Sequence, residues 1–227
     1  MYHKLQKGAL LIADAHYPNH KKEEFVCFLE AIRAKKLQTP QLILMGDIFD
    51  LLVGNSPYLE TLFSKEIALL EAIAKDTEVL YLEGNHDFYL KPLFKKVQTI
   101  ALQNQPLILE HNQKSYALSH GDKYATSFAY RLYTKLIRNP FVLKILPDTI
   151  AKRQLAKMQS KKICKKIAKF NTLAETIQKH YKSDFIIEGH FHQGVIIKNY
   201  IALPSFACSL QYAYFDGEKI TFLNYSL

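Results

Sequence analysis

The chain has 227 residues, of which 48% are hydrophobic, and this is enough for a single large α/β core without a second catalytic domain. Its first apolar run is too short for a secretion signal, and no stretch approaches the roughly 20 apolar residues of a membrane span. These features argue against secreted and membrane-spanning proteins, so we expect a cytoplasmic protein. The formal charge of +9 is compatible with binding to anionic partners.

The three cysteines, Cys27, Cys164 and Cys208, are odd in number and far apart in the sequence, without C-x-x-C spacing. This pattern argues against a disulfide framework and against a thiolate metal site. We expect all three cysteines to be reduced and mostly structural.

Short apolar runs alternate with helical patterns along the chain. Runs at residues 9–12, 42–45 and 79–82 predict strands, and apolar residues at helical spacing predict helices over about 25–37 and 59–73, which gives a βαβ layout. Runs at 116–118 and 185–187 predict two more strands. After residue 192, runs at 195–197, 200–203, 208–215 and 220–223, with an Asp216-Gly217 turn before the last, predict mainly antiparallel strands.

Polar side chains that can bind metals follow five of these apolar runs. They form the segments Asp14-Ala15-His16, Gly46-Asp47-Ile48-Phe49-Asp50, Gly84-Asn85-His86-Asp87, Ser119-His120-Gly121-Asp122 and Gly189-His190-Phe191-His192. Taken alone, several of these segments read as ordinary turns or surface pairs. In open α/β sheets, however, ligands collect at the carboxyl ends of strands, so the five segments together predict one site.

The spacing of these side chains suits two divalent ions. Asp14 and His16 stand two residues apart, so on an extended chain both side chains leave on the same side and can share one ion. His190 and His192 repeat that spacing and could also divide between two ions. Asp47 follows a buried run and a glycine, and its carboxylate could bridge the ions.

Such a pair of ions would support hydrolysis of phosphate esters. Two ions about 3.5–4 Å apart can each bind a phosphate oxygen and lower the pKa of a bridging water, which permits in-line attack near neutral pH. Oxygen-rich mixed ligands without a thiolate favour manganese, iron or zinc, and the sequence does not distinguish among these three. The sequence therefore predicts a two-metal phosphoesterase.

Residues 122–182 fit neither half of the strand pattern and read as an inserted helical cap. This region carries 15 of the 30 lysines and arginines but only three acidic residues, a net charge of +12, whereas the rest of the chain carries −3. Apolar spacing over 163–177 predicts a helix whose outer face presents Lys161, Lys165 and Lys169 to solvent. Residues 130–147 mix basic and apolar side chains. This mixture suits a substrate that is anionic at one end and hydrophobic at the other, or an anionic membrane surface.

The order D-x-H, G-D-x-x-D, G-N-H-D, H and G-H-x-H resembles that of the calcineurin-like metallophosphoesterases. The resemblance implies a single α/β domain over residues 1–227, a four-layer α/β/β/α sandwich with the helical cap inserted at about 122–182. It implies one ion held by Asp14, His16, Asp47 and His192, and a second held by Asp47, Asn85, His120 and His190.

The resemblance also assigns roles beside the ions. It implies that His86 protonates the leaving oxygen or stabilises the charged transition state, and that Asp87 orients His86. Asp50 would support the ligands from behind. A histidine suits the acid role because its side chain can exchange a proton near neutral pH.

The cap narrows the resemblance to the bacterial UDP-2,3-diacylglucosamine pyrophosphatases of lipid A synthesis. His120-Gly121-Asp122, then a tyrosine and an arginine, a Leu-Pro pair and a basic helix are similar to the lid of those enzymes. They cut an anionic lipid-nucleotide substrate into UMP and lipid X. The resemblance implies substrate contacts from Tyr130, Arg131, Arg153, Ser160 and Lys161, and a location that could extend to the cytoplasmic face of the inner membrane.

Other functions remain open. Those lipid A enzymes usually have Arg where this chain has His86, and Leu203-Pro204-Ser205-Phe206 replaces the Gly and Trp expected nearby. A broader phosphomonoesterase or nucleotide pyrophosphatase would keep the same metal ligands. The basic charge also admits a nucleic-acid enzyme, but the cap's aromatic residues lie among long aliphatic residues rather than as isolated stacking platforms. A non-catalytic relative would be expected to have lost ligands, and all seven are present.

Overall fold

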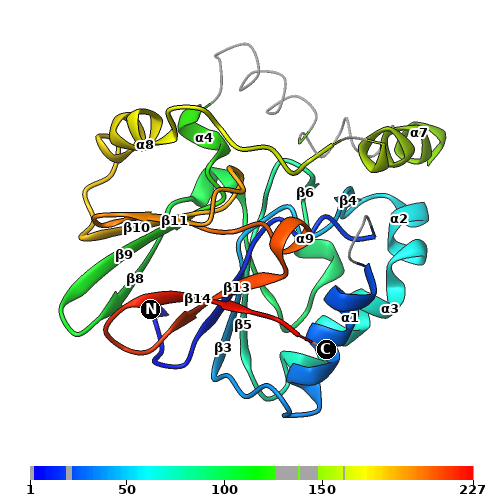
Figure 1. Cartoon of the computed structure of the whole chain (residues 1–227). Helices are drawn as coiled ribbons and strands as arrows, with labels where there is room; N and C mark the ends of the chain where they lie inside the picture. The colour runs from blue at the N-terminus through cyan, green and yellow to red at the C-terminus, as the bar shows by residue number, and fades with distance from the viewer. Residues whose placement is uncertain (1–2, 19–21, 126–137, 139–147, 161, 227) are drawn as a thin grey trace.

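The computed structural model describes residues 3–18, 22–125, 138, 148–160 and 162–226. Two six-stranded sheets pack face to face, with helices against the outer face of each (Figure 1). The predicted α/β/β/α sandwich is therefore confirmed. Much of the predicted cap, residues 126–137, 139–147 and 161, lies outside the described residues, so the single domain with a cap inserted at about 122–182 stays a prediction.

One sheet has the order β14-β13-β2-β3-β5-β7. Strands β2, β3, β5 and β7 are parallel, and the β13–β14 hairpin joins them through an antiparallel β13–β2 pair. The bounds are Leu10–Ile12 (β2), Gln41–Leu44 (β3), Glu78–Leu82 (β5), Gln98–Ile100 (β7), Gln211–Phe215 (β13) and Ile220–Asn224 (β14). The first three apolar runs thus mark real strands to within one residue at each end.

The other sheet has the order β1-β8-β9-β10-β12-β11. Strands β9, β10 and β12 are parallel, whereas β8 and β11 pair antiparallel with β9 and β12. The bounds are His3–Lys4 (β1), Leu107–His111 (β8), Lys114–Ser119 (β9), Phe185–Glu188 (β10), Val195–Ile197 (β11) and Tyr200–Ala202 (β12). A two-stranded parallel pair, β4 (Leu52–Val53) and β6 (Asp87–Phe88), lies outside both sheets.

The strands between the layers are buried on both faces, which explains their unbroken apolar runs. In β2, Leu10 and Ile12 pack under the helices while Leu11 faces the other sheet, because successive side chains alternate across a strand. The helices on this side are α1 (Lys22–Arg33), α2 (Pro57–Leu62) and α3 (Ser64–Ile73). On the opposite outer face, α8 (Phe170–Gln178) packs Phe170 against Tyr200 of β12.

Two sequence predictions, for residues 59–73 and 208–215, are wrong. The pattern over 59–73 is two helices, because Phe63 leaves the helical backbone (φ −105°, ψ 18°) between α2 and α3. The run 208–215 is not one strand: α9 (Phe206–Ser209) ends at Leu210, whose φ of 52° turns the chain into β13. The described strands after residue 192 are mainly antiparallel, as predicted, and only the β12–β10 pair among them is parallel.

The helix predicted over 163–177 begins only at Phe170. Lys169 lies in the left-handed region (φ 58°) just before it, and residues 162–168 are not helical. Backbone groups of this segment bond to the loop after β10: Ile167 N donates to Gln193 Oε1, and Lys165 O accepts from Gln193 Nε2. Lys165 and Lys169 are exposed, as predicted, but they do not share a helix face.

The cysteine prediction is also wrong, because Cys164 and Cys208 form a disulfide. The two lie 44 residues apart, and their spacing carries no sign that the segment after the cap meets α9 in space. Cys27, half-buried in α1, is free. Within the described residues, no helix combines the length and the apolar character needed to cross a lipid bilayer.

Candidate metal centre

The five polar segments meet where their strands end. Asp14, Asp47 and Asn85 follow β2, β3 and β5 of one sheet, and His120 and His190 follow β9 and β10 of the other. Because strands within each set are parallel and the sheets are packed together, their carboxyl ends converge. All seven predicted metal ligands are buried or half-buried.

The backbone at these ligands is unusual. Five of the seven predicted ligands have a positive φ: Asp14 (51°), His16 (46°), Asp47 (51°), His190 (63°) and His192 (57°). This left-handed region costs an L-residue about 1 kcal/mol or more, and such residues cluster at functional sites, where the surrounding structure holds them. Five of the seven predicted ligands therefore occupy a conformation that fold stability alone would not favour.

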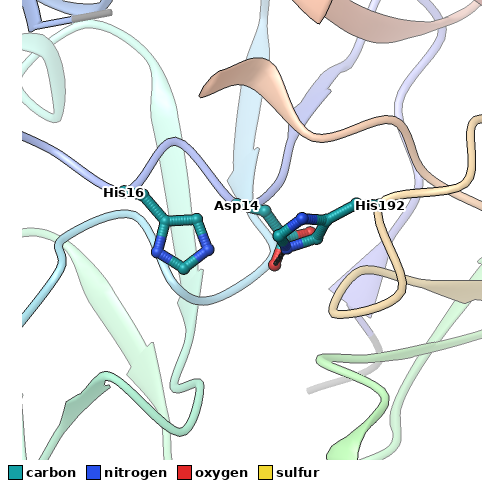
Figure 2. Close-up of side chains that lie close together, drawn as sticks. All are labelled: Asp14, His16 and His192. Carbon is teal, nitrogen blue, oxygen red and sulfur yellow. Dashed lines mark ion pairs between the residues drawn. The ribbon is translucent and has the colours of Figure 1, made fainter. Parts of the chain in front are cut away.

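The first group of ligands is Asp14, His16 and His192, whose ligand atoms all lie within 4.8 Å of one another (Figure 2). Asp14 Oδ1 and His192 Nε2 are 3.2 Å apart. The Asp14 carboxylate also accepts a hydrogen bond from the backbone N of His190 at 2.9 Å. Residues at opposite ends of the sequence thus form one cluster.

The second group is Asp47, His120 and His190, again with ligand atoms within 4.8 Å of one another. Asp47 Oδ2 lies 3.4 Å from His120 Nε2, and Asn85 Oδ1 lies 3.1 Å from the same nitrogen. Since the His190 backbone also bonds to Asp14, the two groups are adjacent parts of one centre.

Two imidazole rings of the ligand groups are oriented by backbone carbonyls. Nδ1 of His120 contacts Met45 O at 3.0 Å, and Nδ1 of His192 contacts Ile163 O at 3.0 Å. A carbonyl oxygen only accepts, so each Nδ1 carries the proton and each Nε2 is left to face the cluster. Histidines that bind metals commonly donate their other ring nitrogen in this way.

Several buried polar atoms have no partner within the described part of the chain. Both ring nitrogens of His16 and both carboxylate oxygens of Asp50 lack a hydrogen bond, although His16 Nδ1 lies 3.4 Å from Asp50 Oδ1. Leaving such groups unsatisfied costs about 1–3 kcal/mol each, and more for charged groups. A divalent cation bound at His16 would remove part of this cost, so the donor set fits a metal.

The electrostatics favour cation binding as well. Burial would raise the pKa of Asp47, but His120 and His86 outweigh it and hold that pKa well below the usual value. Asp14 shows the same balance, with His192 as the neighbour that lowers its pKa. Both carboxylates are therefore ionised, which is the form that binds metals.

A family model described as calcineurin-like phosphoesterase matches residues 9–194, which span all five segments. The chain belongs to the calcineurin-like phosphoesterase family. It is accordingly a metal-dependent phosphoester hydrolase, and family membership implies divalent metal ions at this centre.

Among curated proteins, this phosphoesterase is 28% identical to a UDP-2,3-diacylglucosamine hydrolase of Photorhabdus laumondii over 81% of both chains. It is also 28% identical to the protein of that name from Proteus mirabilis, over 82% of both. Among solved structures, nuclease MPE of Pseudomonas putida matches at 16% identity with a TM-score of 0.45, covering 95% of this chain and 87% of that one.

Two of the residues predicted beside the ions, His86 and Asp87, have other partners than predicted. His86 Nδ1 contacts Asp50 O at 2.8 Å, so the Asp50 backbone, and not Asp87, orients His86. The His86 Nε2 atom lies 3.9 Å from Asp47 Oδ2, at the edge of the second group.

Asp87 instead organises the turn that carries Asp47. Its carboxylate accepts from the backbone N of Asp47 at 2.9 Å, of Ile48 at 2.6 Å and of Gly84 at 2.9 Å, and from Tyr81 Oη at 2.6 Å. Burial and then repulsion by Asp47 raise the pKa of Asp87 to about 7. The predicted role of Asp87 in orienting His86 is therefore wrong.

Other residues near the phosphoesterase centre were missed by sequence reasoning. Gln105 is buried and links two ligand loops, accepting from His120 N at 2.8 Å and donating to Glu83 O at 2.8 Å. Glu188 is buried behind His190 and accepts from Tyr200 Oη and Ser119 Oγ. An acidic residue ending an apolar run was a usable signal for Glu188, whereas nothing in the sequence marks Gln105.

The predicted substrate residues are only partly described. Arg153 is exposed on α7 (Asp148–Gln159), and Ser160 Oγ donates to Lys157 O at 2.8 Å just beyond the end of that helix. Within the described residues, neither contacts a side chain of the two ligand groups. Tyr130, Arg131 and Lys161 lie outside the described residues. All five stay predictions.

Replacing Gly84 with alanine should disrupt this centre. A Cβ there would lie 2.3 Å from Asp47 Oδ1 and 2.5 Å from Asp47 N, so the Asp47 turn must shift. Because a displacement of about 1 Å can cost about 10²-fold in rate, we expect about that loss in turnover. Gly217→Ala is the matched control, since Gly217 (φ 99°) lies in the distant β13–β14 hairpin. Equal turnover of both variants in a phosphodiester assay would refute the expectation.

Proposed function

We propose that this chain hydrolyses the pyrophosphate bond of UDP-2,3-diacylglucosamine, giving UMP and lipid X in lipid A synthesis. The similarity to UDP-2,3-diacylglucosamine hydrolases over 81% of both chains carries this proposal. The two adjacent ligand groups support it, since cleavage of a phosphoric anhydride suits a two-metal centre.

In this proposal each ligand group holds one ion. The first ion is bound by Asp14, His16, Asp47 and His192, and the second by Asp47, Asn85, His120 and His190. We expect manganese, with iron or zinc as alternatives. When bound, two such ions polarise the phosphoryl oxygens and supply an activated water. His86, held through Nδ1 with Nε2 facing Asp47, donates the proton to the leaving group.

Basic residues of the cap region support an anionic substrate. Arg138 Nη2 donates to Gly84 O at 2.7 Å and its guanidinium lies 5.4 Å from the centre of the Phe88 ring, beside the loop that carries Asn85 and His86. Helix α7 exposes Lys152, Arg153 and Lys157. We propose that this basic side receives the diphosphate and also contacts the anionic inner leaflet of the membrane.

The test is product release from the lipid substrate. Purified protein with Mn²⁺ should release UMP from UDP-2,3-diacylglucosamine with a kcat/KM far above its value for bis(p-nitrophenyl) phosphate, p-nitrophenyl phosphate or single-stranded DNA. Comparable or higher kcat/KM for any of those three would contradict the proposed substrate while leaving the hydrolase class intact.

A broader phosphoesterase is the second candidate, and His86 is the observation that favours it. The lipid A enzymes that the chain resembles usually have Arg at this position, whereas the general family pattern has His. A His86→Arg variant separates the two candidates: a gain on UDP-2,3-diacylglucosamine with a loss on p-nitrophenyl phosphate favours the lipid substrate, and the reverse favours the broader enzyme.

A further inference from the structure

The disulfide joins two segments that reach the metal centre from different parts of the sequence. Cys164 lies in the non-helical residues 162–169 that lead into α8, and Cys208 lies in α9. Their Cα atoms are 5.5 Å apart. Neither cysteine is a ligand, so the importance of the bond depends on what each segment holds.

The segment with Cys164 holds His192 and the residue after it. Ile163 O accepts from His192 Nδ1 at 3.0 Å, which fixes the ring so that Nε2 faces Asp14. Gln193 is tied at two further points, accepting through O from Lys166 Nζ at 2.7 Å and through Oε1 from Ile167 N at 3.1 Å. His192 is therefore oriented by residues on both sides of Cys164.

The segment with Cys208 holds Asp14. Ser205 Oγ donates to Asp14 O at 2.8 Å, and the backbone N of Ala207 donates to the same oxygen at 3.2 Å. One residue earlier, Ala13 O accepts from Phe206 N at 3.0 Å. These bonds fix the backbone of Asp14 in its left-handed conformation (φ 51°).

Asp14 and His192 belong to the same ligand group, with Asp14 Oδ1 only 3.2 Å from His192 Nε2. We propose that Cys164 and Cys208 are a reversible oxidation site whose disulfide clamps these two ligands together and so strengthens binding of one ion. The inference rests on the proposed two-ion function. Losing a group that orients a metal ligand typically weakens metal affinity about 10–100-fold, and we expect a change at the lower end, about tenfold.

The bond is placed for exchange with small thiols. Cys164 is exposed and Cys208 is half-buried, so a reagent can approach the bond from the Cys164 side. Lys162, Lys165 and Lys166 are exposed on either side of Cys164 and attract anionic reagents such as glutathione. In reduction, two thiols transfer two electrons and two protons to the disulfide, leaving Cys164 and Cys208 as thiols and the reagent as its own disulfide. Glutathione disulfide reverses the step by the same exchange.

The first experiment counts thiols in the full-length protein. After equilibration with glutathione disulfide and removal of the reagent, the denatured chain should show one reactive thiol, Cys27, and three after treatment with a phosphine reductant. Three thiols in both samples would overturn the inference, because no disulfide would have formed.

The second experiment measures Mn²⁺ binding to the oxidised and phosphine-reduced protein by electron paramagnetic resonance. One of two ions should bind about tenfold more weakly after reduction. Cys164→Ser combined with Cys208→Ser should match the reduced protein and ignore the reductant, whereas Cys27→Ser should respond as the native chain does. If two ions bind with equal affinity to the oxidised and the reduced protein, the disulfide does not strengthen metal binding and this inference is wrong, while the proposed function stands. No bound ion in either state would overturn both.

Discussion

Asp47→Ala is expected to abolish detectable turnover and to release at least one of the two proposed ions. Asp47 lies 3.4 Å from His120 and 3.9 Å from His86, and in the proposed centre its carboxylate serves both ions. Lewis-acid stabilisation by a bound metal contributes several kcal/mol to a phosphoryl transition state, and each 1.36 kcal/mol is tenfold in rate. We therefore expect a loss of at least about 10³-fold in kcat.

Metal content and kcat should be measured on the same preparation. Asp76→Ala is the matched control, because Asp76 is an exposed aspartate in the turn after α3. Asp47→Asn, which keeps the side-chain shape, shows whether lost folding explains the result: it should unfold like the native chain and still lose an ion. Native metal content and turnover in Asp47→Ala would remove Asp47 from the centre.

His86→Ala is expected to slow turnover by about 10²–10⁴-fold, the usual contribution of a positioned acid or base, while both ions stay bound. The ring is held through Nδ1 by Asp50 O, so Nε2 is the atom free to give a proton. No hydrogen bond ties the ring to a ligand side chain within the described residues, so its removal should spare the ligands.

Single-turnover kinetics with a poor and a good leaving group tests this role directly. The defect should be larger with the poor leaving group, because that group needs its proton most. His111→Ala provides the comparison, since His111 packs on Phe215 away from the ligand groups. An equal defect with both leaving groups would assign His86 to charge stabilisation, and unchanged turnover would exclude it from the reaction.

The sequence predicts the strands of the sandwich well because their apolar runs are unbroken. β2, β3, β5, β9 and β10 are buried on both faces along most of their length, so consecutive residues, and not only alternate ones, are apolar. The short strands β1, β4, β6 and β7 carry too few residues for a pattern. The convergence of Asp14 with His192, 178 positions later, follows from the rule that ligands collect at the carboxyl ends of parallel strands.

The errors share a physical cause, which is that long-range contacts overrode local patterns. Apolar spacing over 163–177 favours a helix, but bonds to His192 and Gln193 hold residues 163–167 out of it. The position of Asp87 after His86 suggests a pair, yet Tyr81 and the Asp47 turn supply the partners of its carboxylate. No spacing rule could have joined Cys164 to Cys208.

The most direct test of the metal centre is elemental analysis of the purified, metal-loaded chain together with anomalous diffraction at the metal edge. Two divalent ions per chain, one peak within the group of Asp14, His16 and His192 and one within the group of Asp47, His120 and His190, are the predicted result. No bound ion, or a single peak away from both groups, would contradict it.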